Sequence, residues 1–173
     1  ARLGPVALGP MLARLNSEYQ PLARERGNEL RIRHADAVVH SDPMMLERIV
    51  RNLLSNALRY TENGRILIGA RTRGRNTVLE IYDTGPGIPE SELENIFVEF
   101  HQLGNPERDR DQGLGLGLSI ARRTAALLQH RIVVRSRVGA GSCFVLEMPR
   151  SEAPAPDAVL QPDYLLDLSL IHI

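Results

Sequence analysis

The chain has 173 residues and a formal net charge of zero, with 43% hydrophobic and 4% aromatic residues. This length allows one domain with a largely aliphatic core and a tail. The single cysteine, Cys143, excludes an internal disulfide and a multi-cysteine metal site. The sequence has no run of basic residues that would indicate a nucleic-acid partner. It also has no apolar run that reaches the roughly 20 residues needed to span a bilayer. Because the chain starts at Ala1 without Met, we expect a fragment of a longer protein.

The first third of the chain predicts two helices and two short strands. Apolar residues at three-and-four spacing indicate an amphipathic helix over 11–26, in which Pro21 is expected to cause a kink or a division. Alternating residues predict strands at 30–33 and 38–40. Ser41-Asp42-Pro43 is typical of a helix start, and the periodicity that follows predicts a long, buried helix over 43–60.

The rest of the domain alternates strands and loops. A hairpin is expected with strands at 65–72 and 78–82, followed by an irregular loop at 83–89 and a short helix at 90–97. Residues 98–112 are polar and weakly patterned, which is typical of a functional lid or a disordered segment. A helix to about residue 129 and strands at 132–134 and 143–146 complete the pattern.

The tail, 150–173, is expected to be a solvated, disordered linker because it is acidic and proline-rich. Its end, 167–173, resembles translated sequencing-adapter sequence, and we assign it no function.

Glycines alternate with leucines from Gly113 to Leu118, directly before a predicted helix. Glycine leaves the backbone amides accessible, and the first turn of a helix has unpaired N–H groups, so the stretch is typical of a phosphate-binding lip. A flexible loop that caps a helix is the alternative.

Polar residues on the 43–60 helix and at one strand end form a second group of candidates. Asn52 and Asn56 lie one helical turn apart, and their amide oxygens are suited to Mg²⁺, although they are also compatible with solvent-facing amides. Arg59 offers a cation for phosphate, and Tyr60 offers a ring for a base. Asp83 could accept a hydrogen bond from an exocyclic amine, or it could form an Asx turn.

Five motifs in this order resemble those of bacterial sensor histidine kinases. They are the N box at 51–61, the first glycine box at 83–87, the F box at 96–100, the second glycine box at 113–119 and the small box at 139–144. The resemblance covers roughly residues 10–149, and the lid sequence is most similar to that of hybrid kinases.

The resemblance implies the Bergerat ATP-binding fold. This fold is an α+β two-layer sandwich, here with a mixed sheet of about five strands on about three helices and a mobile ATP lid at 98–116. It implies an N-terminal helical segment, 1–29, that leads into an ATP-binding domain, 30–149, before the tail, 150–173.

The same resemblance assigns roles to residues. Asn56 would ligate Mg²⁺ with support from Asn52, and Arg59 would contact phosphates where the family more often has lysine. Asp83 would bond the adenine amine, and Ser142 would share a water with Asp83 and adenine. The remaining implied nucleotide contacts are Tyr60, Gly85, Gly87, Ile88, Gly113, Leu114, Gly115, Leu116, Gly117 and Leu118, and Arg108 or Arg110 in the lid would reach the γ-phosphate.

The implied function is that of a protein-histidine kinase catalytic domain in a two-component system. It would bind ATP and Mg²⁺ and transfer the γ-phosphate to a histidine on a separate dimerisation hairpin, with a response-regulator receiver domain as a further partner. The parent would be a homodimer, and this domain would lie in the cytoplasm, whether or not the parent is membrane-anchored. Alternatives are the regulatory module of a degenerate kinase and a Bergerat-fold ATPase.

Two further expectations concern residues near the lid. Phe97 and Phe100 are expected to pack the base of the lid rather than contact nucleotide. The five histidines (His34, His40, His101, His130 and His172) are each expected to be surface or packing residues.

Overall fold

A five-stranded mixed sheet is the centre of the fold in the computed structural model, which describes residues 1–33, 36–103 and 115–152. Its strands are β2 (Glu29–Ile32), β4 (Arg65–Arg73), β5 (Asn76–Asp83), β6 (Arg131–Arg137) and β7 (Gly141–Pro149). Their order is β2-β4-β5-β7-β6; β2 and β4 are parallel, and the other neighbours are antiparallel.

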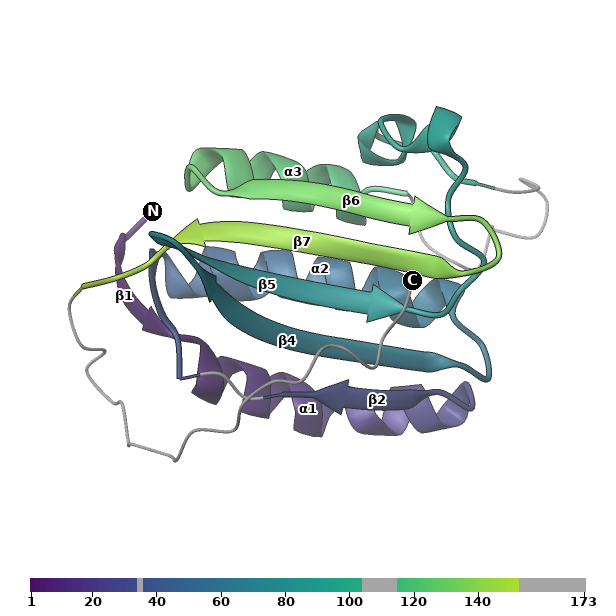
Figure 1. The fold of residues 1–173 in the computed structure, drawn as a ribbon, viewed down its shortest axis with the longest axis horizontal. Helices are drawn as coiled ribbons and strands as arrows, with labels where there is room; N and C mark the ends of the chain where they lie inside the picture. The colour runs from purple at the N-terminus through teal and green to yellow at the C-terminus, as the bar shows by residue number, and fades with distance from the viewer. Residues whose placement is uncertain (34–35, 104–114, 153–173) are drawn as a thin grey trace.

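Three α-helices cover one face of this sheet (Figure 1). They are α1 (Leu8–Glu25), α2 (Pro43–Tyr60) and α3 (Gly117–Leu127). Leu12 of α1, Leu53 of α2 and Phe144 of β7 are fully buried in one hydrophobic cluster between the two layers. The predicted α+β sandwich, with a five-stranded mixed sheet on three helices, is therefore confirmed.

Local chemistry explains where α2 begins. The Asp42 carboxylate accepts from the backbone N–H groups of Met44 and Met45 at 3.0 Å each, and Pro43 occupies the first turn. These hydrogen bonds hold the pKa of Asp42 below its usual range, with the bond from Met45 the largest cause. The cap fixes the helix register and thus which side chains of α2 face the sheet.

Several elements differ from the sequence expectations. A strand β1 (Gly4–Ala7) pairs antiparallel with β3 (Val38–Ser41) in a separate two-stranded sheet, and β1 was not predicted. Pro21 lies inside a continuous α1 rather than dividing it. The helix expected at 90–97 is instead two 3₁₀ turns, η1 (Glu90–Glu92) and η2 (Asn95–Phe97).

Other expectations lie beyond the described ranges. The lid predicted at 98–116 falls largely outside them, as do Arg108, Arg110 and the tail from residue 153, so the mobility of the lid and the domain boundaries stay predictions. Within the described ranges, no helix combines the length and apolar character that crossing a bilayer requires.

Candidate functional site

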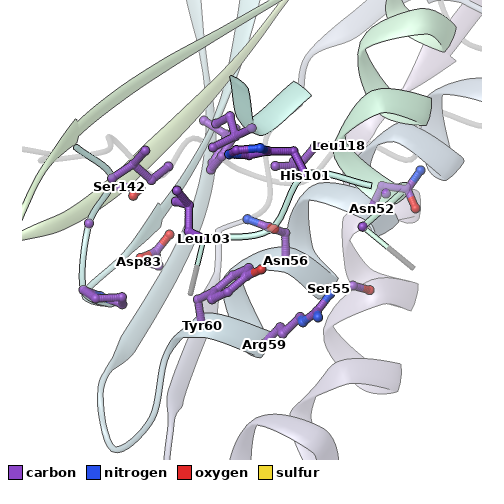
Figure 2. Close-up of a pocket in the computed structure, with 17 residues that line it drawn as sticks. Asn52, Ser55, Asn56, Arg59, Tyr60, Asp83, His101, Leu103, Leu118 and Ser142 are labelled. Carbon is purple, nitrogen blue, oxygen red and sulfur yellow. The ribbon is translucent and has the colours of Figure 1, made fainter. Parts of the chain in front are cut away.

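A cavity of about 290 Å³ lies between α2, the start of α3 and the ends of β5 and β7. Its size is close to that of small-molecule sites. Figure 2 shows Asp83 and Ser142 on one side of this cavity and Asn52 on the other, with Asn56 and Tyr60 between them. Predicted site residues that line the cavity are Asn52, Asn56, Arg59, Tyr60, Asp83, Gly87, Ile88, Gly115, Gly117, Leu118 and Ser142.

The α2 wall presents Asn52, Ser55 and Asn56, whereas Leu53 and Leu54 on the other side of the helix are buried in the core. Asn52 faces the first residue of α3, and its Oδ1 would stand 3.9 Å from a Cβ placed on Gly117. The described residues contain no group of three or more His, Cys, Asp or Glu side chains that could hold a metal. A cation here would therefore rely on these amide oxygens, water and ligand phosphates, a donor set that fits Mg²⁺.

Arg59 supplies positive charge at the end of α2. Its guanidinium lies 5.4 Å from the centroid of the Tyr60 ring. The Nε and Nη2 atoms are buried and have no hydrogen-bond partner among the described residues. Because an arginine is always charged, Arg59 places a positive charge at the cavity wall, where it favours an anionic ligand.

Asp83 is the buried acid at the opposite end of the cavity. It is only 5% exposed, its Oδ1 accepts from the N–H of Gly85 at 2.9 Å, and it also accepts from the backbone of Ser142. Burial raises the pKa of Asp83 to about 6, and these two hydrogen bonds offset the effect only in part. Near pH 7 the group is therefore mainly an ionised acceptor.

Register explains the proximity of Asp83 and Ser142. The two residues are cross-strand partners in the β5–β7 ladder. The Ser142 hydroxyl is paired with the hydroxyl of Ser136 at 2.8 Å. Two distant motifs of the sequence therefore meet at one edge of the sheet.

Gly87 has a position that only glycine fits well. Its φ is +76°, and a Cβ there would collide with the carbonyl oxygen of Arg137. This close approach brings the loop after β5 against the end of β6, and Pro86, Gly87 and Ile88 consequently form part of the cavity wall.

Four predicted site residues are not placed at the cavity. Gly113 and Leu114 lie outside the described residues. Gly85 is not among the lining residues, and its contact with the site is the hydrogen bond to Asp83. Leu116 is also not among them, and its carbonyl instead accepts from the Ser119 hydroxyl at 2.8 Å in the first turn of α3.

The cavity is also lined by six residues that were not predicted as site residues. They are Ser55, Pro86, Ile96, His101, Leu103 and Phe144. His101, expected to be a surface or packing residue, is partly exposed and lines the cavity. Phe97 packs edge-on against Phe144, whereas Phe100 is 67% exposed. Their expected packing against the lid stays a prediction, because residues 104–114 lie outside the described ranges. Only Ser55 had a local signal, since it lies one helical turn after Asn52.

Residues 41–152 match the family described as Histidine kinase-, DNA gyrase B-, and HSP90-like ATPase. This range includes α2, the described glycine residues of the cavity and the closing strands β6 and β7. The chain belongs to this family. Nucleotide binding by this ATPase-family domain agrees with the acid, amides and cation that the cavity brings together.

Curated relatives with the same domain are sensor histidine kinases. AtsR of Burkholderia thailandensis is 33% identical over 162 residues, which are 88% of this chain and 27% of the relative. RcsC of Escherichia coli is 36% identical over 118 residues, which are 68% of this chain and 12% of the relative. The chain therefore spans less than a third of the length of these relatives.

Solved structures of histidine kinases share the fold. The nucleotide-free catalytic domain of ThkA superposes with a TM-score of 0.74 at 25% identity, covering 87% of this chain and 97% of that chain. Full-length ShkA, in complex with AMPPNP, gives a TM-score of 0.76 at 30% identity, covering 89% of this chain and 32% of that one. The predicted Bergerat-type ATPase fold is thus confirmed.

Proposed function

We propose that this chain is the ATP-binding catalytic domain of a two-component sensor histidine kinase. It binds Mg-ATP and transfers the γ-phosphate to a histidine on a dimerisation hairpin of the parent protein. The observation that carries the proposal is a single cavity with a buried acceptor, Asp83, at one end and Arg59 and the two amides of α2 along its wall. The sensor kinases among the relatives support the same activity.

The two ends of the cavity suit the two ends of ATP. Ionised Asp83 accepts a hydrogen bond from the adenine amino group, while the Gly87 backbone and the apolar Ile88 leave room for a flat base. The guanidinium of Arg59, at the cavity wall, binds phosphate oxygens. Asn56 and Asn52 would hold Mg²⁺, which supplies neutralisation of phosphate charge when it is bound.

The α2 wall favours transfer over hydrolysis. An amide cannot accept a proton from water, so Asn52 cannot act as a general base. The site thus holds ATP without activating a water molecule through this residue, and it presents the γ-phosphate to an external nucleophile. Positioning and charge neutralisation provide most of the catalysis in this class of reaction.

The partners of the proposed kinase follow from the transfer. The phosphorylated hairpin histidine would donate its phosphate to the receiver domain of a response regulator. The parent would act as a homodimer, with this domain in the cytoplasm whether or not the parent is membrane-anchored.

Two measurements test the proposed function. Calorimetric titration with ADP and Mg²⁺ is expected to show one nucleotide per chain. Incubation of the chain with γ-labelled ATP and the purified dimerisation hairpin of its parent is expected to yield acid-labile phosphohistidine. Absence of nucleotide binding would contradict the proposal, and so would fast multiple-turnover hydrolysis without phosphohistidine.

A further inference from the structure

We propose that His101, held in place by Glu92, binds a phosphate group of the nucleotide in this cavity. The inference rests on the proposed function, because it requires a nucleotide in the site. It adds a phosphate contact made by a side chain in the segment after η2 rather than by α2 or the glycine segment.

The position of His101 is the first argument. Its ring lines the cavity, and Figure 2 shows it among the side chains that enclose the space. The carbonyl oxygen of His101 would lie 3.2 Å from a Cβ placed on Gly115, and the preceding N–H, of Phe100, donates to the Gly115 carbonyl at 3.2 Å. His101 is therefore next to the glycine wall that leads into the N-terminus of α3, where unpaired N–H groups favour anions.

The orientation of the ring is the second argument. His101 Nε2 lies 2.7 Å from a carboxylate oxygen of Glu92. An ionised carboxylate only accepts, so Nε2 carries the hydrogen of this bond. The remaining polar atom of the ring, Nδ1, is left for the ligand, and as an N–H group it donates to a phosphate oxygen while Nε2–H stays with Glu92.

Glu92 makes the arrangement more specific than a surface ion pair. The side chains of His101 and Glu92 are 31% and 29% exposed, so both are partly withdrawn from solvent. Asn95 Nδ2 lies 3.4 Å from the same Glu92 oxygen and adds a weak second contact. The carboxylate is thereby fixed on η1, and it restricts the imidazole to a limited set of orientations. A pre-oriented ring loses less entropy when it binds a ligand.

The test compares nucleotides that share a base but differ in phosphate. The dissociation constants of ADP and adenosine are measured by NMR titration for the wild type, for His101→Ala and for the control His40→Ala. His40 is exposed and does not line the cavity. A lost hydrogen bond to a charged group is worth about a tenfold or greater loss of affinity. We expect His101→Ala to weaken the affinity for ADP by about that factor and the affinity for adenosine by less than twofold. The affinities of His40→Ala should equal those of the wild type.

A second readout follows the ring itself. In a spectrum of the histidine side-chain nitrogens, the signals missing from His101→Ala identify this residue. The Nδ1 signal is expected to shift when ADP is added and to stay in place when adenosine is added.

The possible results separate the two proposals. Equal ADP affinity in His101→Ala and wild type, or an equal loss of ADP and adenosine, would overturn the role of His101 alone. A wild type that binds neither ligand would overturn the proposed function.

Discussion

Replacing Asp83 by asparagine is expected to stabilise the nucleotide-free protein and to remove its affinity for adenine nucleotides. Burial raises the pKa of Asp83 to about 6, above the value of roughly 3.9 for an exposed aspartate. Between these two values the folded state binds more protons than the unfolded state. The contribution of Asp83 to the free energy of unfolding is therefore complete below about pH 4 and is lost as the pH rises through about 6.

The magnitude follows from the size of the shift. Two pKa units correspond to about 3 kcal/mol, which is the upper bound for the cost of the ionised group at pH 8. Asparagine has nearly the same shape, carries no charge and can still accept from Gly85 through its oxygen. Asp83→Asn should thus raise the free energy of unfolding at pH 8 by about 1–3 kcal/mol, equivalent to several degrees in Tm.

Urea denaturation followed by circular dichroism, at intervals from pH 4 to pH 8, measures this difference. The difference between Asp83→Asn and wild type should be near zero at pH 4 and should grow through about pH 6. Asp36→Asn, at an exposed position, is the matched control and should show no such trend. A variant that is less stable than wild type at pH 8, or a difference that does not vary with pH, would refute the reasoning.

Three further substitutions test other parts of the account. Gly87→Ala should lower the free energy of unfolding in urea by more than about 1 kcal/mol, because Gly87 has a positive φ and the new Cβ would collide with Arg137. Gly74→Ala is the control, because its φ of +61° is similar but open space surrounds it. Equal losses of stability in the two variants would refute the role of the collision. Arg59→Met should weaken the affinity for ATP, measured by calorimetry, by about tenfold or more, while the affinity for adenosine, measured by NMR, is retained. An unchanged affinity for ATP would contradict the role of Arg59 in binding phosphate. Leu12→Ala should lower the free energy of unfolding by about 2–5 kcal/mol and leave a single cooperative transition, because α1 shares its hydrophobic core with the sheet. A separate early transition would show that α1 unfolds alone.

The sequence predicted elements whose signals are local. The cap at Asp42 and the apolar periodicity after it predicted α2, and thus the turn-spaced Asn52 and Asn56. The hairpin of β4 and β5 was also predicted, because alternating residues surround a clear turn. Strand β1 was missed because its four residues pair with β3, more than 30 positions away, and carry no alternation of their own.

The sequence predicted the site residues that lie in recognisable motifs. It missed residues that reach the cavity only through tertiary packing. Asp83 and Ser142 were predicted separately, and strand register brings them together. The position of His101 at the cavity was not predicted, because its contacts with Glu92 and Gly115 depend on how two 3₁₀ turns and the start of α3 pack. Phe144 was expected in a strand and in the small box but not as a site residue, although it also lines the cavity.

The central claim is that Asp83 recognises adenine in this cavity, and a comparison of ATP with GTP tests it most directly. An ionised carboxylate accepts the adenine amino group but offers no donor to the guanine oxygen at the same position. Calorimetric titration of the wild-type chain with Mg²⁺ at pH 8 should show one ATP per chain and an affinity for GTP at least about tenfold weaker. Equal affinities for the two nucleotides, or no binding of ATP, would contradict the account.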